Sequence, residues 1–213
     1  MLVSLDHLLG FAVAAFVLIA IPGPSVLFLV GRALGHGRAV ALLTVLGNTA
    51  GLALVMVLVA FGLGALVTQS ALVFAVVKYV GAAYLVWLGV QTIRHRHDGE
   101  VEAMTEVRRL SRATVVRQGF LVGLFNPKAF MIFAAVLPQF VDRTTGSITG
   151  QMLVLGLVAV LIGLVSDSLW AVIAARLRDW LSSTPRRGRR LGLVGGTSII
   201  GVGVALAATG RPE

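Results

Sequence analysis

The sequence predicts an all-α integral membrane protein with six transmembrane helices, arranged as two inverted three-helix repeats with broken helices 1 and 4. Three observations predict this: the composition, the length of the apolar runs, and prolines inside the first and fourth runs. The 213 residues are 57% hydrophobic and 13% charged, and the mean hydropathy is +0.94. A soluble domain has roughly 45–50% apolar and about 25% charged residues, so the composition argues against a water-soluble fold.

Six continuous apolar runs define the predicted helices. They lie at about 5–30, 39–67, 71–93, 115–141, 151–175 and 191–209. A helix needs about 20 apolar residues to cross the hydrocarbon of a bilayer, and a β-barrel would show short alternating segments instead. The first run is expected to stay in place as a helix, because residues 1–10 contain no Lys or Arg and lack the positive region of a secretory signal.

A mixed-charge connection divides the chain into two halves. Residues 94–114 combine several Arg with Asp98, Glu100, Glu102 and Glu106, which is typical of a solvated linker. The predicted organisation is one transmembrane transporter domain, 1–213. Its parts are repeat one at 1–93, the cytoplasmic linker at 94–114 and repeat two at 115–213.

The distribution of basic residues predicts the orientation. The connections after the first, third and fifth runs, together with Arg117 at the adjoining start of the fourth run, carry fourteen of the eighteen Lys and Arg, whereas the opposite side carries only Arg143 and Arg211. Cytoplasmic loops are enriched in Lys and Arg, so both termini are predicted outside. The net charge of +9 falls in short clusters facing lipid head groups and forms no patch for a nucleic acid. Membrane lipid is therefore an expected partner, and nucleic acid is not.

Two of the predicted helices are interrupted at matching places. Pro22-Gly23-Pro24 breaks the first run and Asn126-Pro127-Lys128 breaks the fourth. A proline removes a backbone donor and clashes with the preceding turn. Because each half has three spans, the second half enters the membrane from the opposite side. In carriers of this design, paired broken helices hold a solute at the midplane, although prolines also occur as simple kinks.

Asp167 is the one acidic residue well inside an apolar run. A buried membrane carboxylate is costly and is expected to face a partner or water, so it either binds a substrate amine, carries a proton, or pairs with Lys128 or Lys78. Asn48 either donates to a solute or bonds between helices. The predicted translocation pathway comprises Pro22, Gly23, Pro24, Ser25, Asn48, Asn126, Pro127, Lys128 and Asp167, with Asp167 as the candidate for proton coupling.

Two pairs of glycines have the spacing that lets membrane helices approach closely. They are Gly47 with Gly51, and Gly119 with Gly123. Tight helix packing is therefore predicted at both pairs. The pattern leaves open whether the packing lies within one chain or between chains of a homo-oligomer.

In order along the chain, the segments IPGPSVLFLVGRALGHGR, VVKYVGAAYLVWLGVQTIR and GFLVGLFNPKAFMIFAAVLPQFV resemble the lysine exporter (LysE/RhtB) family. The resemblance implies a bacterial inner-membrane protein that exports an amino acid or a derivative, by proton antiport and without a cofactor. Many members carry an acid just after the small-residue motif of the second span, where this chain has Asn48 to Leu52. The missing carboxylate favours a neutral or monocationic substrate over lysine or arginine.

Three other functions are weighed against a carrier. A metal or inorganic-ion exporter would need clustered carboxylate, His or thiolate ligands near the midplane, and the spans hold only Asp167 well inside them and no Cys. A membrane-embedded enzyme would need a nucleophile with a base or a metal motif, which the spans do not show. A structural subunit would leave Asp167 and the paired breaks without a role.

Overall fold

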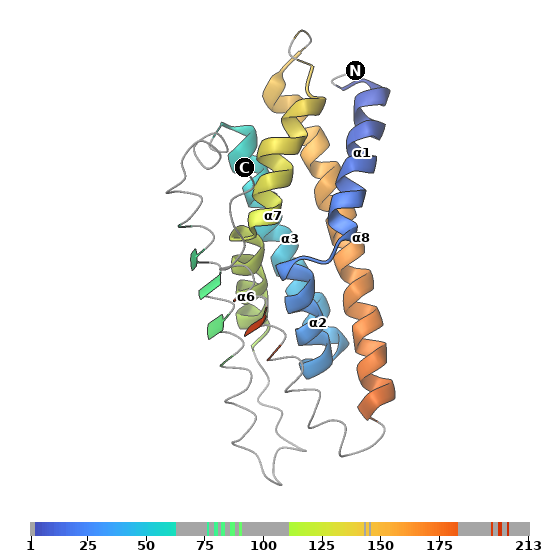
Figure 1. Ribbon diagram of the computed structural model, residues 1–213, viewed down its shortest axis with the longest axis vertical. Coiled ribbons are helices and arrows are strands. Elements are labelled where there is room, and N and C mark those ends of the chain that lie inside the picture. Colours follow the sequence, from blue (N-terminus) through green and yellow to red (C-terminus); the bar gives the residue numbers. More distant parts are fainter. Residues whose placement is uncertain are drawn as a thin grey trace.

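All the secondary-structure elements in the described parts of the chain are helices (Figure 1). The computed structural model describes residues 3–62, 111–142, 144 and 146–182, together with isolated positions between 76 and 204. The predicted all-α class is therefore confirmed. The predicted third and sixth spans, the linker and Lys78 lie outside the described residues, apart from isolated helical positions such as Ala82 and Trp87.

The first predicted span is two helices. Helix α1 (Leu5–Ala20) begins where the side chain of Ser4 accepts a hydrogen bond from the His7 amide, a usual N-cap arrangement. Helix α2 (Pro24–His36) begins with proline at its first position. The two helices meet at an angle of 53°, which confirms the break predicted from the prolines.

The fourth predicted span is also broken. Helix α6 (Arg112–Leu124) ends just before Asn126, and helix α7 (Pro127–Phe130) follows. The chain then continues as the π-helix η2 (Met131–Val136) and the 3₁₀ helix η3 (Leu137–Phe140). The bend between the two parts is 47°. Only the proline break of this span was predicted, because no sequence feature marked the π-helical stretch.

Two unbroken helices complete the described fold. These are α3 (Arg38–Ala60), which follows α2 after a turn at Gly37 with a positive φ of 81°, and α8 (Ile148–Ser182). Both are long and apolar enough to cross a membrane, and each bent pair also qualifies when taken as one span. Figure 1 shows α1 and α2 running down the long axis while α6 and α7 run up it, with both breaks near mid-height.

Large apolar side chains remain exposed along whole helices. On α8 they recur at every fourth residue, at Leu157, Leu161, Val165, Leu169, Ile173 and Leu177. A continuous apolar face of this size is unusual on a protein surrounded by water, and it is expected where a helix faces hydrocarbon. The molecule is a membrane protein with multiple apolar helices.

The glycine pairs bring α3 and α6 into backbone contact. A Cβ added at Gly47 or Gly51 would overlap the carbonyl oxygen of Val116 or Phe120 on α6. The relation is reciprocal, because a Cβ at Gly119 or Gly123 would overlap carbonyl oxygens of α3. The predicted tight packing is confirmed, and in this structure it lies within one chain.

Two apolar clusters lie on either side of the breaks. The first contains residues of α1, α3, α8 and the η2 and η3 segments, with Phe11 and Leu155 at its centre. The second joins α2, α3 and α8 through small side chains such as Ala33, Ala41 and Ala171. The region between the clusters is where the predicted site residues meet.

Candidate functional site

A cavity of about 60 Å³ lies at the level of both breaks. Six of the nine predicted pathway residues line it: Gly23, Ser25, Asn48, Asn126, Lys128 and Asp167. The other three, Pro22, Pro24 and Pro127, set the backbone breaks and are not among its lining residues. A single water needs about 10–15 Å³ of such space, so the cavity has room for several waters or one compact solute.

The first break starts a helix without a side-chain cap next to the cavity. Gly23 is the N-cap of α2 and provides no side-chain hydrogen bond, while Leu27 donates to the Gly23 carbonyl at 3.1 Å. The amides of Ser25 and Val26 precede Leu27 in the first turn, so the helix itself offers them no acceptor. Both residues line the cavity. Together they present two N–H donors at the positive end of a helix dipole.

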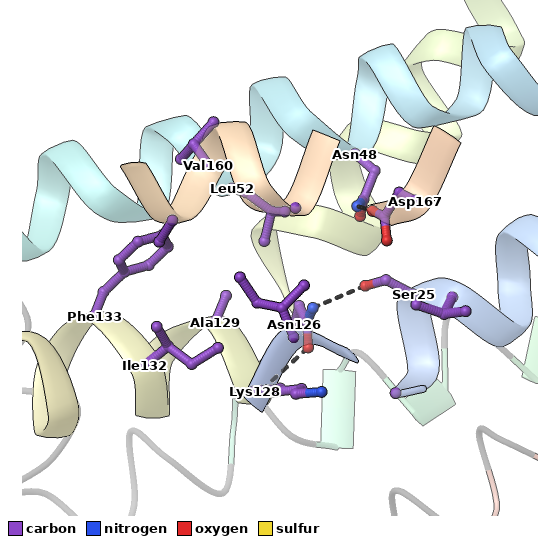
Figure 2. A pocket seen from close by; sticks show the side chains of 15 residues that line it. Ser25, Asn48, Leu52, Asn126, Lys128, Ala129, Ile132, Phe133, Val160 and Asp167 are labelled. Atoms are coloured by element: carbon purple, nitrogen blue, oxygen red, sulfur yellow. Dashed lines mark hydrogen bonds between the residues drawn. The ribbon is translucent and has the colours of Figure 1, made fainter. Parts of the chain in front are cut away.

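The helix that follows the second break is capped by a residue of the break itself. The Oδ1 atom of Asn126 accepts a hydrogen bond from the Lys128 amide at 3.1 Å, which caps α7. The Nδ2 atom of the same side chain donates to Ser25 Oγ at 2.8 Å. Figure 2 shows Asn126 between Ser25 and Lys128, with both bonds drawn. The side-chain amide of Asn126 therefore caps the start of α7 and links the second break to the first by a hydrogen bond.

Lys128 reaches across from the second break to the first. Its ammonium donates to the Ile21 carbonyl, and its Cδ lies 3.2 Å from the place a Cβ of Gly23 would take. Ile21 ends α1, and a cation is favourable at the C-terminal end of a helix. The absence of a side chain at residue 23 leaves room for the lysine stem.

Asp167 is paired with an amide. Asn48 Nδ2 on α3 donates to Asp167 Oδ2 on α8 at 2.8 Å, and the two residues are 0% and 4% exposed. Of the two roles expected for Asn48, the structure shows the hydrogen bond between helices. The Lys128 ammonium is bonded to Ile21, although it lies within electrostatic range of Asp167. The carboxylate keeps its second oxygen for another donor.

The opposite end of the cavity is apolar. Figure 2 shows Asp167, Asn48 and Ser25 at one end, with Phe133 and Val160 at the other. Leu52, Ile132 and Ala159 belong to the same apolar lining. Sequence reasoning missed all of these residues. Helical spacing could have identified some, because Leu52 lies one turn after Asn48, and Gly163 and Ala159 lie one and two turns before Asp167.

One basic residue lies in a place that the sequence did not predict. The sequence interpretation placed Arg32 in the connection after the first span, but it is 4% exposed inside α2. Its guanidinium donates to Gln118 on α6 and lies 5.2 Å from the ring centroid of Phe28. The prediction was wrong because α2 continues six residues past the predicted end of the span, at residue 30.

The charges of the cavity suit a zwitterion. A carboxylate oxygen at Asp167 can accept from an ammonium group, and the first turn of α2 can donate to a carboxylate. Within the described ranges, no group of three or more His, Cys, Asp or Glu side chains is placed to hold a metal ion.

Comparison with known proteins identifies the chain's relatives. Residues 16–210 match the family model described as LysE type translocator. The chain belongs to the LysE-type translocator family. It is therefore a transport protein of the membrane and not an enzyme.

Relatives of this translocator cover from about two thirds to nearly all of its length. A protein of Vibrio cholerae described as an uncharacterized membrane protein is 37% identical over 93% of this chain and 95% of its own. The homoserine/homoserine lactone efflux protein of Salmonella typhimurium is 32% identical over 88% and 89%. The leucine efflux protein of an Enterobacter species is 29% identical over 68% of each chain. No solved structure gives a significant match to the translocator.

Proposed function

We propose that this translocator exports a neutral or monocationic amino acid, or a close derivative, across the bacterial inner membrane as a proton-driven antiporter. The observation that carries the proposal is the meeting of Asp167 with the uncapped first turn of α2 in one cavity. The relatives named as efflux proteins for homoserine, homoserine lactone and leucine support the same substrate class.

The proposed binding mode uses both ends of a zwitterion. The substrate ammonium lies at Asp167, whose partner Asn48 holds the carboxylate in place. The substrate carboxylate accepts from the Ser25 and Val26 amides, with Lys128 as the nearby cation. Charge-assisted hydrogen bonds of this kind are about twice as strong as neutral ones, so the pair selects compounds carrying both groups.

Asp167 is also the proposed site of proton coupling. A substrate ammonium and a proton are alternative partners for a buried carboxylate, because each neutralises its charge. Binding of one therefore favours release of the other. Proton entry from outside then displaces the substrate, which gives exchange of the two across the membrane.

The proposed architecture is the one expected from the sequence. Six spans form two inverted repeats, 1–93 and 115–213, joined by the cytoplasmic linker 94–114, and both termini lie outside. The opposite directions of the two broken spans support this arrangement. In carriers built from such repeats, the solute site at the breaks opens alternately to the two sides.

Asp167→Asn tests the function directly. The amide keeps the shape of the side chain but loses the charge that holds an ammonium or a proton. We expect export against a gradient to fall by at least about a hundredfold, since charged hydrogen bonds contribute about 1.5–3 kcal/mol and coupling is lost as well. The assay is counterflow and pH-driven efflux of amino acids in proteoliposomes, with protein insertion measured in parallel.

The matched control is Asp6→Asn, because Asp6 is an exposed acid in the first turn of α1. That variant should retain wild-type efflux. Full pH-driven activity in Asp167→Asn would refute the assignment of the substrate amine and the proton to this residue.

A further inference from the structure

Five buried glycines lie on the spanning helices at places where a side chain has no room. At Gly47, Gly51, Gly119 and Gly123 an added Cβ would overlap backbone of the facing helix, and at Gly156 it would overlap Met56. Close helix packing explains these five residues. Another buried glycine, Gly163 on α8, has a different environment.

Gly163 has room for a side chain although it is buried. An added Cβ would meet a single heavy atom within 4 Å, Leu52 Cδ1 at 4.0 Å, which is an ordinary van der Waals separation. Gly163 also lines the cavity. The space beside it is thus the cavity itself, and no neighbouring helix requires a glycine at this position.

The position of Gly163 links it to the charged end of the cavity. It lies one helical turn before Asp167 on the same face of α8, at a rise of about 6 Å along the axis. Ala159 lies one further turn along and is also small. The apolar side chains of Leu52, Ile132, Phe133 and Val160 surround this part of the cavity.

We propose that Gly163 determines substrate size by leaving space for the side chain of the exported amino acid. The inference rests on the proposed function, with the substrate ammonium at Asp167. The side chain then extends over Gly163 toward Ala159 and contacts Leu52 and Phe133. The distance of about 6 Å between these turns accommodates an apolar chain of about four carbons, so the substrate class is neutral amino acids up to the size of leucine.

A charged side chain does not fit this end of the cavity. Among the cavity residues near Gly163, only Asp167 and Asn48 carry a charge or a hydrogen-bonding side chain, and in the proposed binding mode Asp167 already holds the substrate α-ammonium. Placing a second ammonium among Leu52, Ile132 and Phe133 would remove its water without a partner, which is costly. The apolar subsite therefore excludes lysine and arginine.

The test replaces Gly163 by Ala and by Val and measures counterflow of alanine, leucine and lysine in proteoliposomes. In Gly163→Val, leucine transport should fall by about tenfold or more, because valine adds three carbons to the subsite and a single methylene in a hydrophobic pocket is worth about 10–200-fold. Alanine transport should stay within about twofold of wild type. Gly163→Ala should give a smaller change in the same direction.

The matched controls are Gly35→Ala and Gly35→Val. Gly35 is a helical glycine of α2 with no heavy atom within 4 Å of an added Cβ, and it is not a cavity residue. These variants should leave the leucine-to-alanine ratio unchanged. Adding Leu52→Ala to Gly163→Val should restore leucine transport, because it removes the atom nearest the new side chain.

The outcomes separate this inference from the proposed function. If wild-type protein transports alanine and leucine but Gly163→Val changes neither, or lowers both equally, Gly163 does not set substrate size and the exporter function stands. If wild-type protein transports no member of the panel, the proposed function fails, and the inference fails with it.

Discussion

The two helix breaks share a proline at the first helical position but differ in how their backbone groups are satisfied. At the second break, Asn126 caps α7 with its own side chain. At the first break, α2 has no side-chain cap, and the Ile21 carbonyl is bonded by Lys128 from the other half of the chain. The difference indicates that the second break supports the first through Asn126 and Lys128, while the first turn of α2 stays without a side-chain cap.

Proline replacement at the two breaks tests this asymmetry and has the largest expected effect. Pro24→Ala restores a backbone donor, and a proline inside a helix costs about 3 kcal/mol, so a straight helix gains up to about that amount. Transport should fall by about a hundredfold. Pro127→Ala should lower transport only about tenfold, because the Asn126 cap still contributes about 0.5–2 kcal/mol to the stability of the broken conformation.

Transport kinetics and thermal stability of both variants are the measurements, with Pro138→Ala in η3 as the control. Pro127→Ala should lower transport more than stability. Equal losses of transport at the two breaks would contradict the asymmetry. A loss of folded protein that matches the loss of transport would show that both prolines act only as structural kinks.

Asn126→Ala has the next largest expected effect, because it removes both the cap of α7 and the bond to Ser25. The two contributions are about 0.5–2 kcal/mol for the cap and about 0.5–1.5 kcal/mol for the bond. We expect transport to fall about thirtyfold, measured as initial efflux rate.

Asn126→Ser separates the two roles of the side chain. Serine still caps a helix but has no amide to reach Ser25, so it should recover the cap alone and show a loss of about tenfold or less. If the alanine and serine variants were equally active, the link between the breaks would have no part in transport.

Lys128→Gln has the smallest effect of the three and concerns the residue shared by both breaks. Removing the ammonium weakens the bond to Ile21 and the attraction for a substrate carboxylate, so KM should rise about tenfold with a smaller change in maximal rate. Arg117→Gln, at an exposed position of α6, is the control for loss of one positive charge. A change in maximal rate alone would assign Lys128 a structural role.

The broken helices were predictable because proline acts on its own helix, and the residues around the two prolines identify the breaks without knowledge of the neighbours. The pairings within the cavity were not. Asn48 had two open roles, and only the fold shows that α3 and α8 bring its amide to Asp167.

Glycine was the hardest residue to interpret from sequence. Gly47 and Gly119 belong to spaced pairs that predict helix packing, and the structure agrees. Gly163 has no such partner, and its role depends on empty space that several helices create together. The burial of Arg32 was missed for a related reason, since the length of α2 depends on packing against α8 and α3 and not on local apolarity.

The reciprocal glycine contacts between α3 and α6 have a mechanical consequence. Carbonyl oxygens occupy the places of the missing side chains on both helices, so neither helix can turn or slide against the other without a steric clash. We expect α3 and α6 to move together as one rigid unit, which joins the two halves of the chain. In the proposed transport cycle, α1, α2, α7 and α8 would move around this pair to expose the cavity to alternate sides of the bilayer.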